Sequence, residues 1–105
     1  MIFGRGRFHE LVQRQLDLFE EDQASVLAEA HELEARWTNA TAEESEALYG
    51  EFQLVVDAFG ELLYDARETY AATLDEQTAS DYRAAFDRAA VKRFRRYATF
   101  LEEDG

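Results

Sequence analysis

The sequence contains no cysteine and no proline among its 105 residues, and it has only five glycines. The absence of cysteine excludes a disulfide scaffold, a zinc site built on thiolates, and thiol catalysis. Proline and glycine are the residues that most disfavour a helix interior, so their scarcity predicts long helices and few irregular turns. The length corresponds to one domain, which we expect to cover residues 1–105.

Basic residues are also scarce, with 11 Lys and Arg against 23 Asp and Glu, which gives a net charge of −12. A chain this acidic repels phosphate backbones, so we expect no nucleic-acid partner. The sequence also lacks a run of roughly 20 apolar residues, and we expect neither a secretory leader nor one of the common lipid anchors. We therefore expect a cytoplasmic protein with no membrane partner.

The sequence does contain helical periodicity. Apolar residues recur at steps of three and four, the pattern of amphipathic helices. The expected helices cover residues 7–38, 42–72 and 79–103. Thr41 and Glu44 have the spacing of a capping box before the second helix, and Thr78 and Ser80 are two candidate N-caps for the third.

Three helices with short connections pack antiparallel in sequence order, which predicts an all-α, up-down-up three-helix bundle with two long helices and a shorter third. The third helix would then run parallel to the first. That arrangement brings a basic cluster near an acidic end of the same fold, and we expect the two to pair within the chain instead of serving a partner. The cluster is Lys92, Arg93, Arg95 and Arg96, and the acidic end holds Glu29, Glu32, Glu34 and Glu43.

Metal binding has weak support in the sequence. Helical bundles that hold two metal ions use a glutamate three residues before each histidine, because those positions share a helix face. Neither His9 nor His31 has such a glutamate. His31 and Glu34 are the least implausible ligands, on one flank of the first helix, and we expect that flank to be solvated with no metal and no cofactor.

Catalysis is not expected either. Four carboxylates form a stripe on the second helix, but the stripe lies about half a turn from the apolar line, so it faces water and has no pocket in which to act. The sequence contains no nucleophile motif and no Gly-rich phosphate loop. We therefore predict no catalytic residues. The carboxylates are Asp57, Glu61, Asp65 and Glu68.

Aromatic residues make up 13% of the chain, with eight phenylalanines, and a narrow three-helix core cannot enclose every large ring. A shorter third helix would also leave the far end of the other two uncovered. We therefore predict self-association, as a symmetric dimer. The candidate interface residues are Trp37, Leu48, Tyr49, Gly60, Phe94, Tyr97 and Phe100.

These features together predict a non-catalytic, acidic interaction, scaffold or regulatory module that acts through self-association and contacts with a protein partner. Two other functions stay open. One is a helical-bundle metal-carboxylate protein of the ferritin-like type. The other is an acidic decoy that inhibits a basic protein by taking the place of a phosphate backbone.

Overall fold

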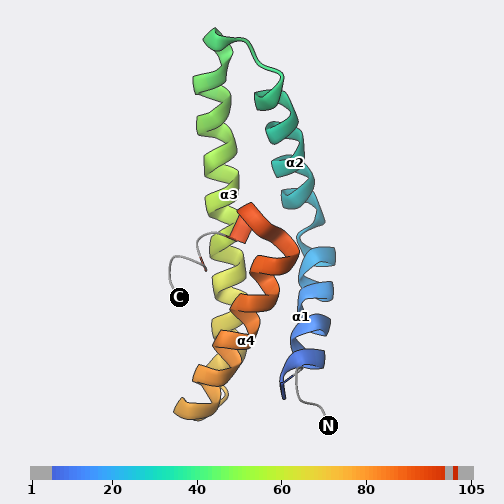
Figure 1. The fold of residues 1–105 in the computed structure, drawn as a ribbon, viewed down its shortest axis with the longest axis vertical. Helices are drawn as coiled ribbons and strands as arrows, with labels where there is room; N and C mark the ends of the chain where they lie inside the picture. The colour runs from blue at the N-terminus through green and yellow to red at the C-terminus, as the bar shows by residue number, and fades with distance from the viewer. Residues whose placement is uncertain (1–5, 99–100, 102–105) are drawn as a thin grey trace.

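The computed structural model describes residues 6–98 and residue 101, and this part of the chain is all-α, as the sequence predicts (Figure 1). It contains four α-helices and one short 3-10 helix, not three helices. Their bounds are His9–Asp22 for α1, Ala24–Thr38 for α2, Ala42–Ala71 for α3, Glu76–Phe94 for α4 and Arg95–Ala98 for the 3-10 helix η1.

The prediction of one continuous helix over residues 7–38 is wrong, because the helix breaks at Gln23. This residue has φ −106° and ψ 25°, outside the helical range, and separates α1 from α2. The last turn of α1 contains Glu20, Glu21 and Asp22 and no basic residue. Negative charges oppose the negative end of the helix dipole, so they weaken α1 where it ends.

The second expected helix is confirmed as α3, which begins at the predicted residue and ends one residue earlier than expected. Its capping box is present: the Glu44 backbone N–H donates to Thr41 Oγ1, and the Thr41 backbone N–H donates to Glu44 Oε1, both at 3.3 Å. This reciprocal pair satisfies two amides that the first turn would otherwise leave without partners.

The third expected helix has different ends in the structure. Neither Thr78 nor Ser80 caps it. The cap is Asp75, whose carboxylate accepts hydrogen bonds from the Thr78 backbone N–H at 2.9 Å and from Thr78 Oγ1 at 3.0 Å. The helix also stops at Phe94 because Arg95 adopts φ 53°, which turns the chain into η1. The predicted end at residue 103 lies outside the described residues.

An aromatic cluster joins three of the helices. Phe19 of α1, Phe59 of α3 and Phe94 of α4 meet edge to face, with ring centroids 5.4, 5.1 and 6.0 Å apart. Such pairs each contribute about 0.5–1.5 kcal/mol beyond the burial of their area. The cluster therefore fixes the C-terminal end of α4 between the other two helices.

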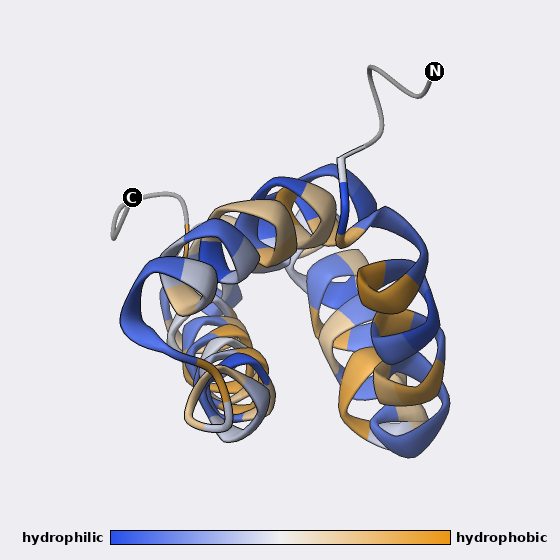
Figure 2. Cartoon of the chain, turned by 90° about the horizontal axis from the view of Figure 1, so that it is seen from below, coloured by the Kyte–Doolittle hydropathy of each residue, from blue (hydrophilic) through white to orange (hydrophobic). Residues whose placement is uncertain are grey.

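The fourth helix covers only one side of this arrangement. α2 packs along the N-terminal half of α3, whereas α4 packs on the C-terminal half of α3 and on α1. Seen along the long axis, α1 and α3 form the two arms of a V, with α4 at its closed side (Figure 2). Within the described part of the chain, no helix covers the opposite side. We call this the open side.

The cap assignment predicts a specific loss of stability. Asp75→Ala removes the acceptor for the first turn of α4 and is expected to lower the free energy of unfolding by about 1 kcal/mol. Ser80→Ala, at an exposed position inside α4, is expected to change it by less than about 0.5 kcal/mol. Urea denaturation measures both values, and a larger loss for Ser80→Ala would contradict the assignment.

Candidate interaction surface

Five apolar residues line the open side. Leu11 and Leu18 are seven residues apart on α1, and Leu48, Val55 and Leu62 are spaced by seven on α3, so each set follows one flank of its helix. Leu18 is 55% exposed. The other four are half-buried and pack against the edge of the core. We call these five residues the open face.

The open face points away from α4. On α1, His9 and Gln13 face α4 across a cavity, and Leu18 lies about 140° around the helix from Gln13. On α3, Arg67 bonds to α4, and Leu62 lies about 140° around the helix from Arg67. Hydrophobic segments follow both arms of the V in Figure 2.

Gln15, a polar residue beside the open face, has a hydrogen-bond partner within the chain. Gln15 lies between Leu11 and Leu18 on the same flank of α1, and its Oε1 accepts a hydrogen bond from the Tyr82 hydroxyl at 2.7 Å. The ring of Tyr82 is completely buried, and this burial raises the pKa of Tyr82 to about 12. The bond therefore engages the Gln15 side chain within the fold.

The interface residues predicted from the sequence lie in different places. Leu48 belongs to the open face by its spacing, and it borders the end of α2, with which it lines a surface hollow. Trp37 is half-buried, with its ring stacked on Phe52 at 6.1 Å and its N–H donated to Ser45 Oγ at 3.2 Å. Tyr49 is 46% exposed beside Trp37. These two aromatic residues lie near the turn between α2 and α3, beyond the end of α4.

The remaining candidates do not form a surface of the chain. Gly60, Phe94 and Tyr97 are buried, where they pack against the chain's own helices. Phe94 ends the buried line of α4, whereas η1 folds back over α3 and carries Tyr97 into contact with Phe52 and Phe59. Phe100 lies outside the described residues.

An ionic network attaches α4 to α3. Arg67 is only 4% exposed, and its Nη1 donates to both Asp87 carboxylate oxygens, at 2.8 and 2.9 Å. Its Nε donates to Glu68 Oε2 at 2.9 Å. Arg83 of α4 donates to both Glu68 oxygens, each at 2.9 Å. Two cations and two carboxylates therefore alternate across the α3–α4 contact.

The network shifts the pKa values of its members. Burial lowers the pKa of Arg67, but the hydrogen bonds and charges of Asp87 and Glu68 outweigh it, so the pKa is raised overall. The hydrogen bond from Arg83 lowers the pKa of Glu68 most. The hydrogen bond from Arg67 and the charges of both arginines lower it further, against the opposing effect of burial. Sequence reasoning missed Arg67, although its spacing of four from Leu63 and Ala71 places it on the buried line of α3.

The predicted stripe of carboxylates is divided by this network. Glu68 is half-buried and faces α4, whereas Asp57, Glu61 and Asp65 are exposed. Gln53 Nε2 donates to Asp57 Oδ1 at 3.4 Å, along the surface of α3. The structure does not bring these four carboxylates together.

The candidate metal ligand Glu34 is bound within the fold. Its Oε1 accepts the hydroxyl of Tyr97, and its Oε2 pairs with Arg96. Burial and the Glu34 carboxylate raise the pKa of Tyr97. His31 lies beside the Tyr97 ring, with centroids 5.4 Å apart. Within residues 6–98 and residue 101, no group of three or more potential ligands could hold a metal ion.

The expected pairing of the basic cluster is present in part. Arg96 pairs with Glu34 of α2, as predicted. Arg93 instead pairs with Asp17 and Glu20 of α1, at 2.8 and 3.3 Å, because α4 lies alongside α1.

Comparison of the chain with protein-family models, curated proteins and solved structures finds no match. Among the described helices, none combines the length and the apolar character needed to cross a membrane.

The ionic network predicts a large effect of removing one partner. Asp87→Ala leaves the buried Arg67 charge without its main acceptor and is expected to cost about 3–5 kcal/mol of unfolding free energy. Asp81→Ala, on the exposed side of α4, is expected to cost less than about 0.5 kcal/mol. Chemical denaturation of both variants tests this difference, and equal costs would rule out the network as the attachment of α4.

The pKa shift of Glu68 predicts acid sensitivity. Because the folded pKa of Glu68 lies below the ordinary glutamate value of 4.5, its stabilisation is fully present above that pH and is lost as the pH falls through the folded pKa. In the Glu68→Gln variant, the free energy of unfolding is therefore expected to decrease less steeply as the pH falls below about pH 5. Urea titrations from neutral pH to pH 3 measure the slope. The exposed control Glu61→Gln should retain the wild-type slope.

Proposed function

We propose that this protein is a non-catalytic interaction module that acts by self-association, and that two copies meet through the open face. The observation that carries the proposal is the line of apolar residues on α1 and α3, on the side that α4 leaves uncovered. Apolar surface that a fold leaves uncovered is a recurrent mark of an interaction site.

A second copy fits this face because of symmetry. A two-fold axis places the same surface of each copy against the other, so every contact occurs twice. When two open sides meet, each V supplies two arms, and the four arms form a closed helical bundle. The leucines of α1 then gain the apolar neighbours that α4 does not supply.

The charges beside the open face favour one orientation. Arg14 is exposed and borders the leucines of α1, three residues after Leu11 and four before Leu18. Glu51 and Asp65 are exposed and border the equivalent line on α3. Opposite charges therefore meet if α1 of one copy faces α3 of the other, whereas like charges meet if α1 faces α1. Exposed pairs of this kind set orientation more than affinity.

The two alternative functions have less support. Glu34 is occupied by Tyr97 and Arg96, so no specific observation favours a metal-carboxylate protein. The acidic decoy stays a prediction, because no contact within the chain tests it.

The oligomeric state tests the proposal. Wild-type protein is expected to sediment as a dimer, at twice the chain mass of 12.1 kDa, and Leu18→Glu is expected to sediment as a monomer at the same concentration. A buried glutamate at this contact would lack a partner, and its charge would be costly to desolvate.

The matched control is Leu54→Glu, because Leu54 is 71% exposed on α3 but lies outside the open face. This variant should remain a dimer. A wild-type chain that is monomeric at millimolar concentration, or an equal loss of dimer in both variants, would contradict the proposal.

A further inference from the structure

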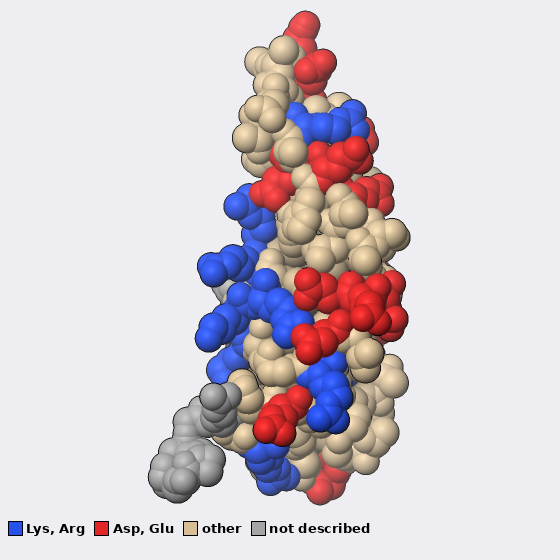
Figure 3. Space-filling model, turned by 90° about the vertical axis from the view of Figure 1, so that its right-hand side faces the viewer, with Lys and Arg blue, Asp and Glu red and all other residues tan. Residues whose placement is uncertain are grey.

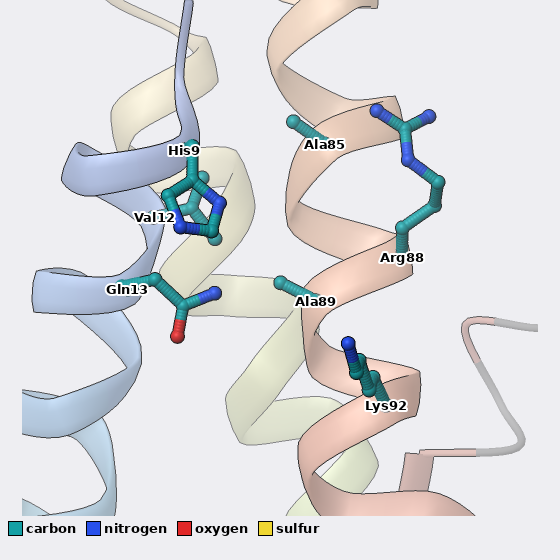
Figure 4. A pocket seen from close by; sticks show the side chains of 7 residues that line it. All are labelled: His9, Val12, Gln13, Ala85, Arg88, Ala89 and Lys92. Atoms are coloured by element: carbon teal, nitrogen blue, oxygen red, sulfur yellow. The ribbon is translucent and has the colours of Figure 1, made fainter. Parts of the chain in front are cut away.

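A cavity of about 330 Å³ lies between α1 and α4, on the other flank of α1 from the open face (Figure 4). Pairs of residues four positions apart, one pair on α1 and two pairs on α4, follow its length. Its lining residues are His9, Val12, Gln13, Ala85, Arg88, Ala89 and Lys92.

Small side chains keep the cavity open. Ala85 and Ala89 are four residues apart on α4 and face α1, where longer side chains would fill the space. Val12 is 1% exposed and gives the cavity an apolar floor. The site therefore combines an apolar base with polar groups nearer to the solvent.

The polar groups of the cavity are nitrogen-rich. Arg88 and Lys92 are exposed cations one helical turn apart on α4, and His9 and Gln13 are one turn apart on α1 (Figure 4). Gln13 Oε1 already accepts a hydrogen bond from Arg93 at 2.9 Å, which leaves its amide N–H₂ as the donor toward a ligand. No carboxylate lines the cavity.

The fold pairs only some of its cations with carboxylates. Four arginines of the described chain, Arg67, Arg83, Arg93 and Arg96, form such ion pairs. Arg88 and Lys92 have no ion pair with a described Asp or Glu, and the same holds for Arg7, Arg14, Arg36 and Arg95. Lys and Arg gather along one edge of the molecule in Figure 3, apart from most of the acidic side chains. Positive charge is thus retained locally beside a cavity.

We propose that this cavity binds the phosphate group of a small phosphate monoester, with its organic part against Val12 and the two alanines. A phosphate dianion presents three acceptor oxygens, which suits the point charge of Lys92 and the forked donors of Arg88, once that side chain turns inward from the outer side of α4 where Figure 4 shows it. A single carboxylate offers fewer acceptors and less charge to two cations. The proposal does not depend on self-association, because the cavity and the open face lie on different flanks of α1.

Amide chemical shifts of the full chain, followed by NMR at constant ionic strength, test this site. Titration with phenyl phosphate is expected to give saturable shifts centred on Val12, Gln13, Arg88 and Ala89. Inorganic phosphate should shift the same amides more weakly, because it lacks the apolar group. Benzoate should give little change, and equal affinity for benzoate would overturn the assignment to phosphate.

Two variants test the contributions of the cavity's charge and of its shape separately. Arg88→Glu is expected to weaken phenyl phosphate binding at least about tenfold, the cost of losing one charge-assisted hydrogen bond. Ala89→Leu retains every charge but fills the cavity, and should lower the affinity by a similar factor. Circular dichroism confirms that each variant is folded.

The matched control is Arg36→Glu, which makes the same charge change at an exposed position on α2. Its affinity should stay within about twofold of wild type, because exposed charges further away than a Debye length are largely screened. Shifts that do not saturate, an equal loss in Arg36→Glu, or full binding by Ala89→Leu would each overturn the proposal.

Discussion

The buried guanidinium of Arg67 constrains the rest of this structure. A charge at 4% exposure is tolerated only beside carboxylates that match it, and these are Asp87 on α4 and Glu68 on α3 itself. Since Asp87 must reach Arg67, α4 is held on one particular flank of α3. The edge-to-face contacts among Phe19, Phe59 and Phe94 then bring α1 against the same helix. One ionic contact and one aromatic cluster together decide which side of the fold is closed.

The two sides of the V consequently have different chemistry. On the closed side, the contact between α1 and α4 uses small residues and leaves a cavity bordered by cations. On the open side, no further helix of the described chain lies between the arms that α1 and α3 form (Figure 2). A single chain with one more helix would cover the open side, and a second copy supplies the equivalent helices without lengthening the chain. Arg88 and Lys92, the cations of α4 that pair with no described carboxylate, lie beside this cavity.

Local signals in the sequence predicted the parts of the fold that depend on local contacts. The capping box of Thr41 and Glu44 placed the start of α3, because both partners lie within one turn. The break at Gln23 was missed because the apolar spacing continues through it. Such spacing shows which face of a helix is apolar, but it does not show where a helix is interrupted. The start of α4 was missed because Asp75, Thr78 and Ser80 are all good caps, and only the backbone geometry selects Asp75.

The candidate site depended on contacts between distant segments, and for this reason less of it was predictable. The sequence indicated that apolar surface would remain uncovered, and Leu48 is part of that surface. It did not indicate that α4 would close one flank only, which is what exposes Leu18. Phe94 and Tyr97 have the composition of an interface, but Phe94 lies on the buried line of α4, and the positive φ of Arg95 turns Tyr97 into the core. A backbone turn of that kind at a non-glycine residue leaves no clear mark in the sequence.

The most direct test of the central claim, that the open face is where copies meet, is the solvent accessibility of its methyl groups. A soluble paramagnetic chelate enhances methyl relaxation wherever it can approach. We expect strong enhancement at Leu18 and Leu62 in dilute protein and its loss in concentrated protein, while Leu54 stays accessible in both. If Leu18 and Leu62 follow Leu54 at every concentration, the open face is in contact with water and copies of the chain do not meet there.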